Sequence, residues 1–527
     1  MFSLRSLSLY FALILPIVVS TRSHAITIAV TTTNDNMTGC LRYAITNANA
    51  TTAGANTITF NLPGPTYTIN LTSPLPAIIN PLTIDGTSQP GYVNAPLIEL
   101  SGAGIVAGGA IGLQLNAGSS PSTVMGLAIN NFNFEGIALN GASNVIQGNF
   151  IGTDPTGTYA RGNSVAGISV ASQGNLIGDT AAIARNIISG NGTGIILNGS
   201  GVTGNIIKGN YIGTDISGTT AIANNTNGIQ LNLASANVIG PSNLISGNKL
   251  AGIFFSGNGA NSNSVIGNYI GTEITGTTAL GNTYAAVTIS GALGNQIGGR
   301  NAGNGNVLSG NLQDGIFLTG GSSGTVVQGN LIGLSAAGTN AIANGYSGID
   351  IAGSSSNSIG GLAISGARNF ISGNTGYGVA IYQTNDTFNL VSGNYIGTDI
   401  NGQRAVTNLL SGILVKGCSN TIGWSKGIGS GNVISGNGQL GIWLLGTNGS
   451  TRGNQVSGNI IGLDYTGTNI LGNSQAGIEI SGAATNQIGG TSSSTRNAIS
   501  GNGYNGIFLL GAGTIGNVIQ GLSLIHI

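Results

Sequence analysis

The stretch Asn432–Gly490, NVISGNGQLGIWLLGTNGSTRGNQVSGNIIGLDYTGTNILGNSQAGIEISGAATNQIGG, recurs in recognisable copies along most of the chain. One phrase of it, N-x-[IL]-S-G-N, begins at six asparagines that lie 57, 63, 63, 63 and 65 residues apart. A fixed period of this length indicates a solenoid or a propeller, in which each repeat packs against the next. The six starting residues are Asn186, Asn243, Asn306, Asn369, Asn432 and Asn497.

The phrase G-I-W-L (Gly441–Leu444) predicts a short strand. Ile442 and Leu444 are two residues apart, so they point to one face of a strand while Trp443 points to the other. Glycine and asparagine interrupt the chain every few residues, which leaves no room for long helices. A propeller blade would need antiparallel hairpins, whereas these strands recur in the same order. The sequence therefore predicts an all-β parallel solenoid with two coils in each period of about 62 residues.

The repeat G-I-x-L followed by N-x-I-x-G-N, over about residues 75–521, resembles the right-handed parallel β-helix family of the pectin-lyase-like superfold. The resemblance implies a single right-handed parallel β-helix. It also implies that inward asparagines form one hydrogen-bonded ladder at one bend. The superfold includes lyases, hydrolases, adhesins and inert stalks, so the resemblance does not imply one activity.

The two ends of the chain differ from the repeats. Residues 1–25 carry Arg5 and an apolar stretch around Tyr10–Val19, which is typical of a secretory signal peptide cleaved near Ala25. We therefore expect a secreted or cell-surface protein without a membrane span. Residues 26–125 are expected to form an N-terminal cap and irregular first coils, and residues 126–521 the regular repeats. Residues 522–527 (LSLIHI) interrupt the pattern and are interpreted as an artefactual tail.

Cys40–Ala50 is the best candidate for a helix. Leu41, Ala44, Ile45 and Ala48 recur at helical spacing and would share one apolar face. A solenoid exposes unpaired backbone at its ends, so we expect this helix to cap the N-terminal end. Arg42 is then expected on its solvated face.

Charge restricts the partners of the protein. Only 5% of the residues are charged and the formal net charge is zero. Removing the leader, with Arg5 and Arg22, leaves 14 acids against 12 bases. Such a surface has no basic stripe for nucleic acid or anionic lipid. A neutral glycan or another protein is the expected partner. Cys40 and Cys418 are predicted to lie too far apart for a disulfide.

Histidine is nearly absent. His24 and His526 are the two in the chain, and they lie in the expected leader and tail. Serine or cysteine nucleophiles activated by histidine, and histidine-ligated metals, are therefore not expected in the repeats. We predict no catalytic residue, no metal site and no cofactor.

Acidic residues recur at one loop position of the repeat. Because they appear once in almost every period, we interpret them as turn caps rather than as a calcium or catalytic site. The same interpretation applies to Asp85 before Gly86. The recurring acids are Asp154, Asp215, Glu273, Asp399 and Asp464.

The outward residue of G-I-x-L forms a strip along the rod, called the outward strip below. Aromatic members two coils apart would be about 10 Å apart, close to the length of a disaccharide. One hypothesis is a binding track for a glycan or a protein; the alternative is that the inserted loops bury the strip as a second core. The candidate binding residues are Phe254, Phe317, Trp443, Phe508, Asp350 and Glu479.

These observations favour a non-catalytic β-helix rod, adhesin-like or ligand-binding along the outward strip. Regularity argues for it, because chemistry needs one place that differs from the repeat. The alternative is a polysaccharide lyase or hydrolase of the same superfold. It would use Asp350 or Glu479 together with a base from a neighbouring coil, such as Arg368 or Lys416.

Overall fold

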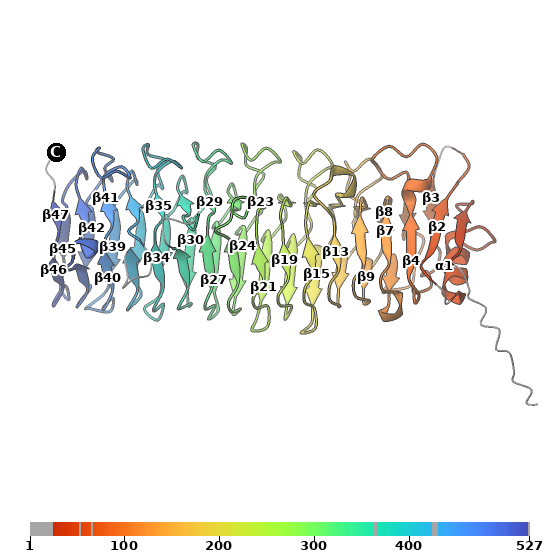
Figure 1. Cartoon of the computed structure of the whole chain (residues 1–527), viewed down its shortest axis with the longest axis horizontal. Coiled ribbons are helices and arrows are strands. Elements are labelled where there is room, and N and C mark those ends of the chain that lie inside the picture. Colours follow the sequence, from red (N-terminus) through yellow and green to blue (C-terminus); the bar gives the residue numbers. More distant parts are fainter. Residues whose placement is uncertain (1–24, 52–53, 65–66, 362–365, 424–429, 525–527) are drawn as a thin grey trace, which may run out of the picture.

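The chain forms a long rod with three faces (Figure 1). The computed structural model describes residues 25–51, 54–64, 67–361, 366–423 and 430–524. The one α-helix of these residues, α1 (Leu41–Ala50), lies at the N-terminal end of the rod. The strands form three parallel sheets, here called A, B and C, with 17, 16 and 14 strands. The fold is a right-handed parallel β-helix, as the family resemblance implied, and its parallel coils confirm the solenoid that the repeat predicts.

Sheet A contains one strand from each coil. In order of pairing its strands are β1 (Thr27–Val30), β2 (Asn56–Phe60), β4 (Leu82–Asp85), β7 (Thr123–Met125), β10 (Val145–Gln147), β13 (Leu176–Ile177), β16 (Ile206–Ile207), β19 (Val238–Ile239), β22 (Ser264–Val265), β25 (Gln296–Gly298), β28 (Val326–Gln328), β31 (Ser358–Gly360), β34 (Leu390–Ser392), β37 (Thr421–Gly423), β40 (Gln455–Ser457), β43 (Gln487–Gly489) and β46 (Val518–Gln520).

Sheet B follows sheet A in each coil after the first, where α1 follows β1 instead. Its strands are β3 (Thr68–Asn70), β5 (Ile98–Ser101), β8 (Leu127–Asn130), β11 (Phe150–Ile151), β14 (Ile187–Ile188), β17 (Tyr211–Ile212), β20 (Leu244–Ile245), β23 (Tyr269–Ile270), β26 (Val307–Leu308), β29 (Leu331–Ile332), β32 (Phe370–Ile371), β35 (Tyr395–Ile396), β38 (Val433–Ile434), β41 (Ile460–Ile461), β44 (Ala498–Ile499) and β47 (Ser523–Leu524).

Sheet C closes each coil and holds the G-I-x-L phrase. Its strands are β6 (Leu113–Leu115), β9 (Glu135–Leu139), β12 (Ala166–Val170), β15 (Thr193–Asn198), β18 (Ile229–Asn232), β21 (Ile253–Ser256), β24 (Val287–Ser290), β27 (Ile316–Thr319), β30 (Ile349–Ala352), β33 (Val379–Ile381), β36 (Ile413–Val415), β39 (Ile442–Leu445), β42 (Ile478–Ser481) and β45 (Ile507–Leu510).

Asparagine occupies the corner before each of the three sheets, so the rod contains three ladders rather than the single ladder that the resemblance implied. In each ladder a side-chain amide donates to the amide oxygen of the asparagine one coil further on. The ladder before sheet B, for example, consists of Asn149, Asn186, Asn210, Asn243, Asn268, Asn306, Asn330, Asn369, Asn394, Asn432, Asn459 and Asn497.

Asn243 shows how a typical ladder asparagine is hydrogen-bonded. Its Oδ1 accepts from the backbone N–H and the Nδ2 of Asn210, at 3.0 and 3.1 Å. Its Nδ2 donates to the Ile207 carbonyl at 2.8 Å and to Asn268 Oδ1 at 2.9 Å. All four bonds of the amide are therefore made inside the rod, where an unpaired one would be costly.

The predicted cap helix is confirmed. Its four apolar residues, Leu41, Ala44, Ile45 and Ala48, are buried against the first coil. Cys40 caps the helix, since its Sγ accepts from the backbone N–H of Tyr43 at 3.3 Å. Both cysteines of the chain, Cys40 and Cys418, are free.

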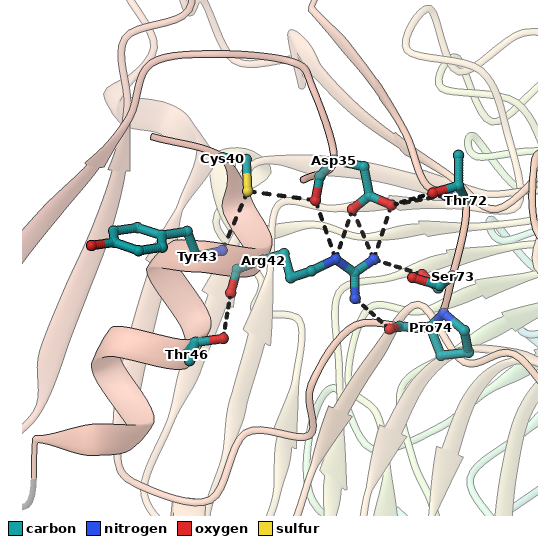
Figure 2. A network of polar contacts seen from close by, with 8 residues as sticks. All are labelled: Asp35, Cys40, Arg42, Tyr43, Thr46, Thr72, Ser73 and Pro74. Carbon is teal, nitrogen blue, oxygen red and sulfur yellow. Dashed lines mark hydrogen bonds and ion pairs between the residues drawn. The ribbon is translucent and has the colours of Figure 1, made fainter. Parts of the chain in front are cut away.

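Arg42 does not lie on a solvated face, so that prediction is wrong. Figure 2 shows its guanidinium between Asp35 and the Ser73–Pro74 backbone. Its Nη2 lies 2.8 Å from Asp35 Oδ1, and the Arg42 side chain is only 19% exposed. Asp35 also accepts from Thr72, so the Arg42–Asp35 pair ties the cap to a following loop.

The inserted loops cover sheet B. Each is a small hairpin that begins after a sheet B strand, such as the loop with the Thr214–Ala221 bridge. Successive loops bond to each other, as when the N–H of Ile216 donates to the Gly157 carbonyl at 3.1 Å. Tyr211 on sheet B is thereby buried. Gly213 opens one loop at φ +93°, where a Cβ atom would lie 2.3 Å from the Ser246 carbonyl oxygen.

The expected leader and the expected tail lie at the two ends of the chain, which the structure describes only in part. Residues 1–24, which carry most of the expected leader, and residues 525–527 of the expected tail lie outside the described residues. Ser523 and Leu524, by contrast, form β47 and pair with β44. Within the described ranges, no helix has the length and apolarity needed to cross a membrane.

One break in a ladder gives a stability test. Thr325 replaces asparagine before sheet A, and Asn295 Nδ2 and Thr325 Oγ1 have no hydrogen-bond partner there. We predict that Thr325→Asn stabilises the protein by about 0.5–1.5 kcal/mol, because the new amide can accept from Asn295. Urea unfolding midpoints would measure the gain. Thr325→Val is the matched control, since it removes the hydroxyl without adding an amide; an equal gain from valine would contradict ladder repair.

Candidate functional site on the outer face of sheet C

The outward strip lies on the outer face of sheet C, in register from coil to coil. Phe254 pairs with Thr288, Thr288 with Phe317, and Phe317 with Asp350. Further along, Trp443 pairs with Glu479 and Glu479 with Phe508. The six candidate binding residues therefore share one face, as their spacing predicts.

The loops do not bury this face as a second core, because they fold over sheet B. Phe254, Phe317 and Trp443 are partly exposed, and Phe508 is 38% exposed. Tyr284 packs edge-on against Phe317, with ring centroids 6.3 Å apart. The aromatic members of the strip thus present ring surface to solvent while their inner edges are packed.

Two cavities open on sheet C. The larger, of about 430 Å³, is lined by Glu135, Ser169, Ile196 and the amides of Asn198 and Asn232. The smaller, of about 190 Å³, is lined by Asn227, Leu250, Ala251, Phe254, Tyr284 and Thr288. Hollows that combine apolar walls with a few polar groups are the usual form of a ligand site.

Three buried polar atoms of the outward strip have no hydrogen-bond partner within the protein: Thr288 Oγ1, Asp350 Oδ1 and Trp443 Nε1. Buried polar atoms are normally paired, so each unpaired one needs an explanation. All three side chains lie on the outer face of the same sheet. A ligand lying along the strip would pass over each of them.

Around Asp350 the strip departs from the repeat. Asp350 lies in the middle of β30, and Asp314 precedes β27 in the coil before it. Asp314 is 6% exposed, and its Oδ1 accepts from the Ser347 backbone N–H at 2.9 Å. On the coil after Asp350, the rings of Tyr377 and Tyr382 meet edge-on at 6.3 Å.

The environment shifts the protonation of both acids. Burial, followed by the charges of Asp314 and Asp386, raises the pKa of Asp350 to about 8. Burial also raises the pKa of Asp314 to about 6, although the Ser347 N–H bond opposes it. Burial and then the Asp350 charge raise the pKa of Tyr382 to about 12. Two neighbouring carboxyls with pKa values near and above neutrality are typical of functional sites.

The two basic residues expected to act with Asp350, Lys416 and Arg368, both lie against tyrosine rings. Lys416 lies on the same face, but its ammonium sits 5.3 Å from the centroid of the Tyr382 ring. The expectation that Arg368 is a partner of Asp350 is wrong. Its guanidinium carbon lies 3.9 Å from the centroid of the Tyr395 ring, which belongs to sheet B. Glu479 accepts a hydrogen bond from Ser481 in its own strand.

The recurring loop acids act as turn caps, as predicted. Burial alone would raise the pKa of Glu273, but hydrogen bonds from the Thr275 hydroxyl and from the Thr275, Thr277 and Thr278 N–H groups outweigh it and lower the pKa to about 2. Asp464 is bonded in the same way, and its pKa is also lowered to about 2. Asp85 likewise accepts from the Thr87 N–H at 2.9 Å.

Sequence reasoning identified Asp350 but missed Asp314, Tyr377 and Tyr382. Asp314 stands before the G-I-x-L phrase and so lies outside the strip. A comparison of that position between repeats could have found it, because other coils carry Ala251, Ala285 or Ser347 there. Among the described residues, no group of three or more His, Cys, Asp or Glu side chains is placed to hold a metal ion.

No family model and no curated protein matches the chain. The similar proteins that were found are solved structures. The Dettilon tailspike protein is 19% identical, with a TM-score of 0.43; the match covers 69% of this chain and 64% of that one. This chain thus spans less than two thirds of the tailspike's length. The periplasmic alginate epimerase AlgG is 11% identical over 88% of this chain and 77% of its own, with a TM-score of 0.31. The A-module of the Azotobacter vinelandii mannuronan C-5 epimerase AlgE4 is 13% identical over 94% and 97%, with a TM-score of 0.25. At these identities the likeness concerns the fold alone.

The acid pair predicts a pH dependence of stability. Folded Asp350 keeps its proton up to about pH 8, whereas the unfolded carboxyl loses it near its ordinary value of 3.8. Between these values the folded state binds more protons, so stability falls as pH rises. We predict that Asp350→Asn flattens this slope and raises the melting temperature more at pH 8 than at pH 5. Melting curves of both proteins from pH 4 to 9 test this; parallel curves would contradict it.

Proposed function

We propose that the protein is a secreted or cell-surface rod that binds a neutral glycan along the outer face of sheet C. The observation that carries the proposal is the contrast between two faces. Stacked loops cover sheet B, whereas the partly exposed aromatic strip of sheet C carries three buried polar atoms without partners. In this role the rod is adhesin-like, since holding a glycan needs no reaction.

The spacing of the aromatic residues supports a repeating ligand. Phe254 and Phe317 are two coils apart, Phe317 and Trp443 four, and Trp443 and Phe508 two. Coils stack at about 4.8 Å, so rings recur at multiples of about 10 Å. A glycan chain repeats on a similar length, and ring faces can pack against the apolar faces of its sugars. The low charge of the chain favours a neutral glycan over a polyanion.

Removing single rings tests the proposal. We predict that Trp443→Ala and Phe254→Ala each weaken binding of a neutral polysaccharide about ten-fold, because each removes a stacking surface of about 1–1.5 kcal/mol. Affinity electrophoresis against a panel of neutral and acidic polysaccharides would measure the change.

The matched control is Tyr159→Ala, which removes a 72% exposed ring from a loop over sheet B. It should bind like the wild type. Equal losses from the control and from the sheet C variants would contradict this location. Absence of binding to every polysaccharide, together with binding to a protein, would replace the glycan with a protein partner.

A further inference from the structure

We propose that the protein binds a small apolar carboxylate in a cavity beside sheet B, with Arg185 holding the carboxylate group. The cavity has a volume of about 400 Å³ and lies against strands β11 and β14 of sheet B, so the inference is independent of glycan binding on sheet C. Segments far apart in the sequence surround it, including the 3₁₀ helix η3 (Ala182–Ala184) and the inserted loop after β17. Among the lining residues are Asn94, Phe150, Ile183, Arg185, Ile187 and Ile216.

The guanidinium of Arg185 is held on one face and at one nitrogen. Its Cζ lies 4.1 Å from the centroid of the ring of Tyr211, a buried residue of β17. Its Nε donates to the Gly209 carbonyl oxygen at 3.2 Å. Within the part of the chain that the structure describes, Nη1 and Nη2 of Arg185 have no hydrogen bond or ion pair. Because a stacked guanidinium keeps its edge free for further bonds, Arg185 is a fixed cation with donors to spare.

The lining indicates the class of ligand. Arg185 is the one charged side chain among the lining residues, Asn94 is the other polar one, and the rest are apolar. A carboxylate matches a single guanidinium, since it can accept two parallel N–H···O bonds. A phosphate carries more charge and more acceptor oxygens than one arginine can satisfy. Phe150 and the isoleucines supply surface for an apolar body, and the volume suits a small molecule.

A second arginine makes the same contacts in different surroundings. Arg368 occupies the position of Arg185 in a later copy of the phrase R-N-x-I-S-G-N. Its Cζ lies 3.9 Å from the centroid of the Tyr395 ring, and its Nε donates to the Gly393 carbonyl oxygen at 3.2 Å. In register with Tyr395 is Phe370, and the two rings pack edge-on with centroids 5.6 Å apart. At Arg368 an aromatic ring thus stands beside the stacked pair.

At Arg185 a smaller side chain stands in that place. Ile187 pairs with Tyr211 as Phe370 pairs with Tyr395, and Ile187 lines the cavity. The exchange of phenylalanine for isoleucine therefore leaves room beside the guanidinium. Ile183 and Ile216, which are 56% and 40% exposed, also line the cavity, so it opens to solvent between them.

The test is isothermal titration of the full chain with 2-naphthoate, a rigid carboxylate with an apolar body. We expect saturable binding at a single site. The uncharged analogue 2-naphthamide should bind about ten-fold more weakly or worse, because a bond to a charged group is lost. Inorganic phosphate should not compete with naphthoate.

Two variants remove the site in different ways. Arg185→Gln removes the cation, and Ile187→Phe fills the cavity with the side chain that stands beside Arg368. Each should weaken naphthoate binding about ten-fold or more. Arg368→Gln is the matched control, because it loses the same ring stacking and the same backbone bond. It should bind naphthoate like the wild type, and its melting temperature should fall by as much as that of Arg185→Gln.

Each outcome supports or overturns the proposal. Equal affinity for naphthoate and naphthamide would overturn the role of the cation. Equal binding losses in Arg185→Gln and Arg368→Gln, or full binding by Ile187→Phe, would overturn the location of the site. Phosphate binding more tightly than naphthoate would overturn the ligand class, and no saturable binding of naphthoate would overturn the proposal as a whole. The glycan experiments on sheet C are unaffected by any of these results.

Discussion

The structure depends on one interaction, the hydrogen bond from the amide of one asparagine to the amide of the asparagine in the next coil. This bond repeats at the three corners of the regular coils, with one interruption at Thr325. Together with the bonds to strand carbonyls it pairs the buried ladder amides of the described residues, except at Asn295. Because both donor and acceptor are fixed, neighbouring coils can stack in one register only. The ladders therefore hold the three sheets in line along the whole shaft.

Constant register has a functional consequence. Residues at equivalent positions of different coils form straight files on the outside of the rod, so a side chain repeated every second coil is presented at a regular distance. The inserted loops use this regularity on sheet B, where each loop bonds to its neighbour two coils away and buries residues such as Tyr211. Sheet C has no such cover. Its partly exposed aromatic residues, Phe254, Phe317 and Trp443, therefore lie on a face that the loops leave open.

Much of the fold could be predicted from sequence, because it depends on local patterns that repeat. The alternation in G-I-W-L predicted which side chains point to each face of a strand. The helical spacing of Leu41 and Ala44 predicted the cap helix. Features that depend on contacts between distant residues could not be predicted. The partner of Arg42 is Asp35, which lies on the turn before the helix, and the inserted hairpin loops fold over the sheet B strands that precede them. Asp314 was missed because its distance from Asp350 depends on how two coils with different loops align.

The central claim is that the open face of sheet C, and not the loop-covered face of sheet B, is the binding face. The most direct measurement is hydroxyl-radical footprinting of the full chain with and without its best-binding polysaccharide. The account predicts slower oxidation of Phe254, Phe317 and Trp443 in the complex, with unchanged oxidation of Tyr159 and Tyr465 on the loops. Protection of Tyr159 and Tyr465, with none at Trp443, would contradict it.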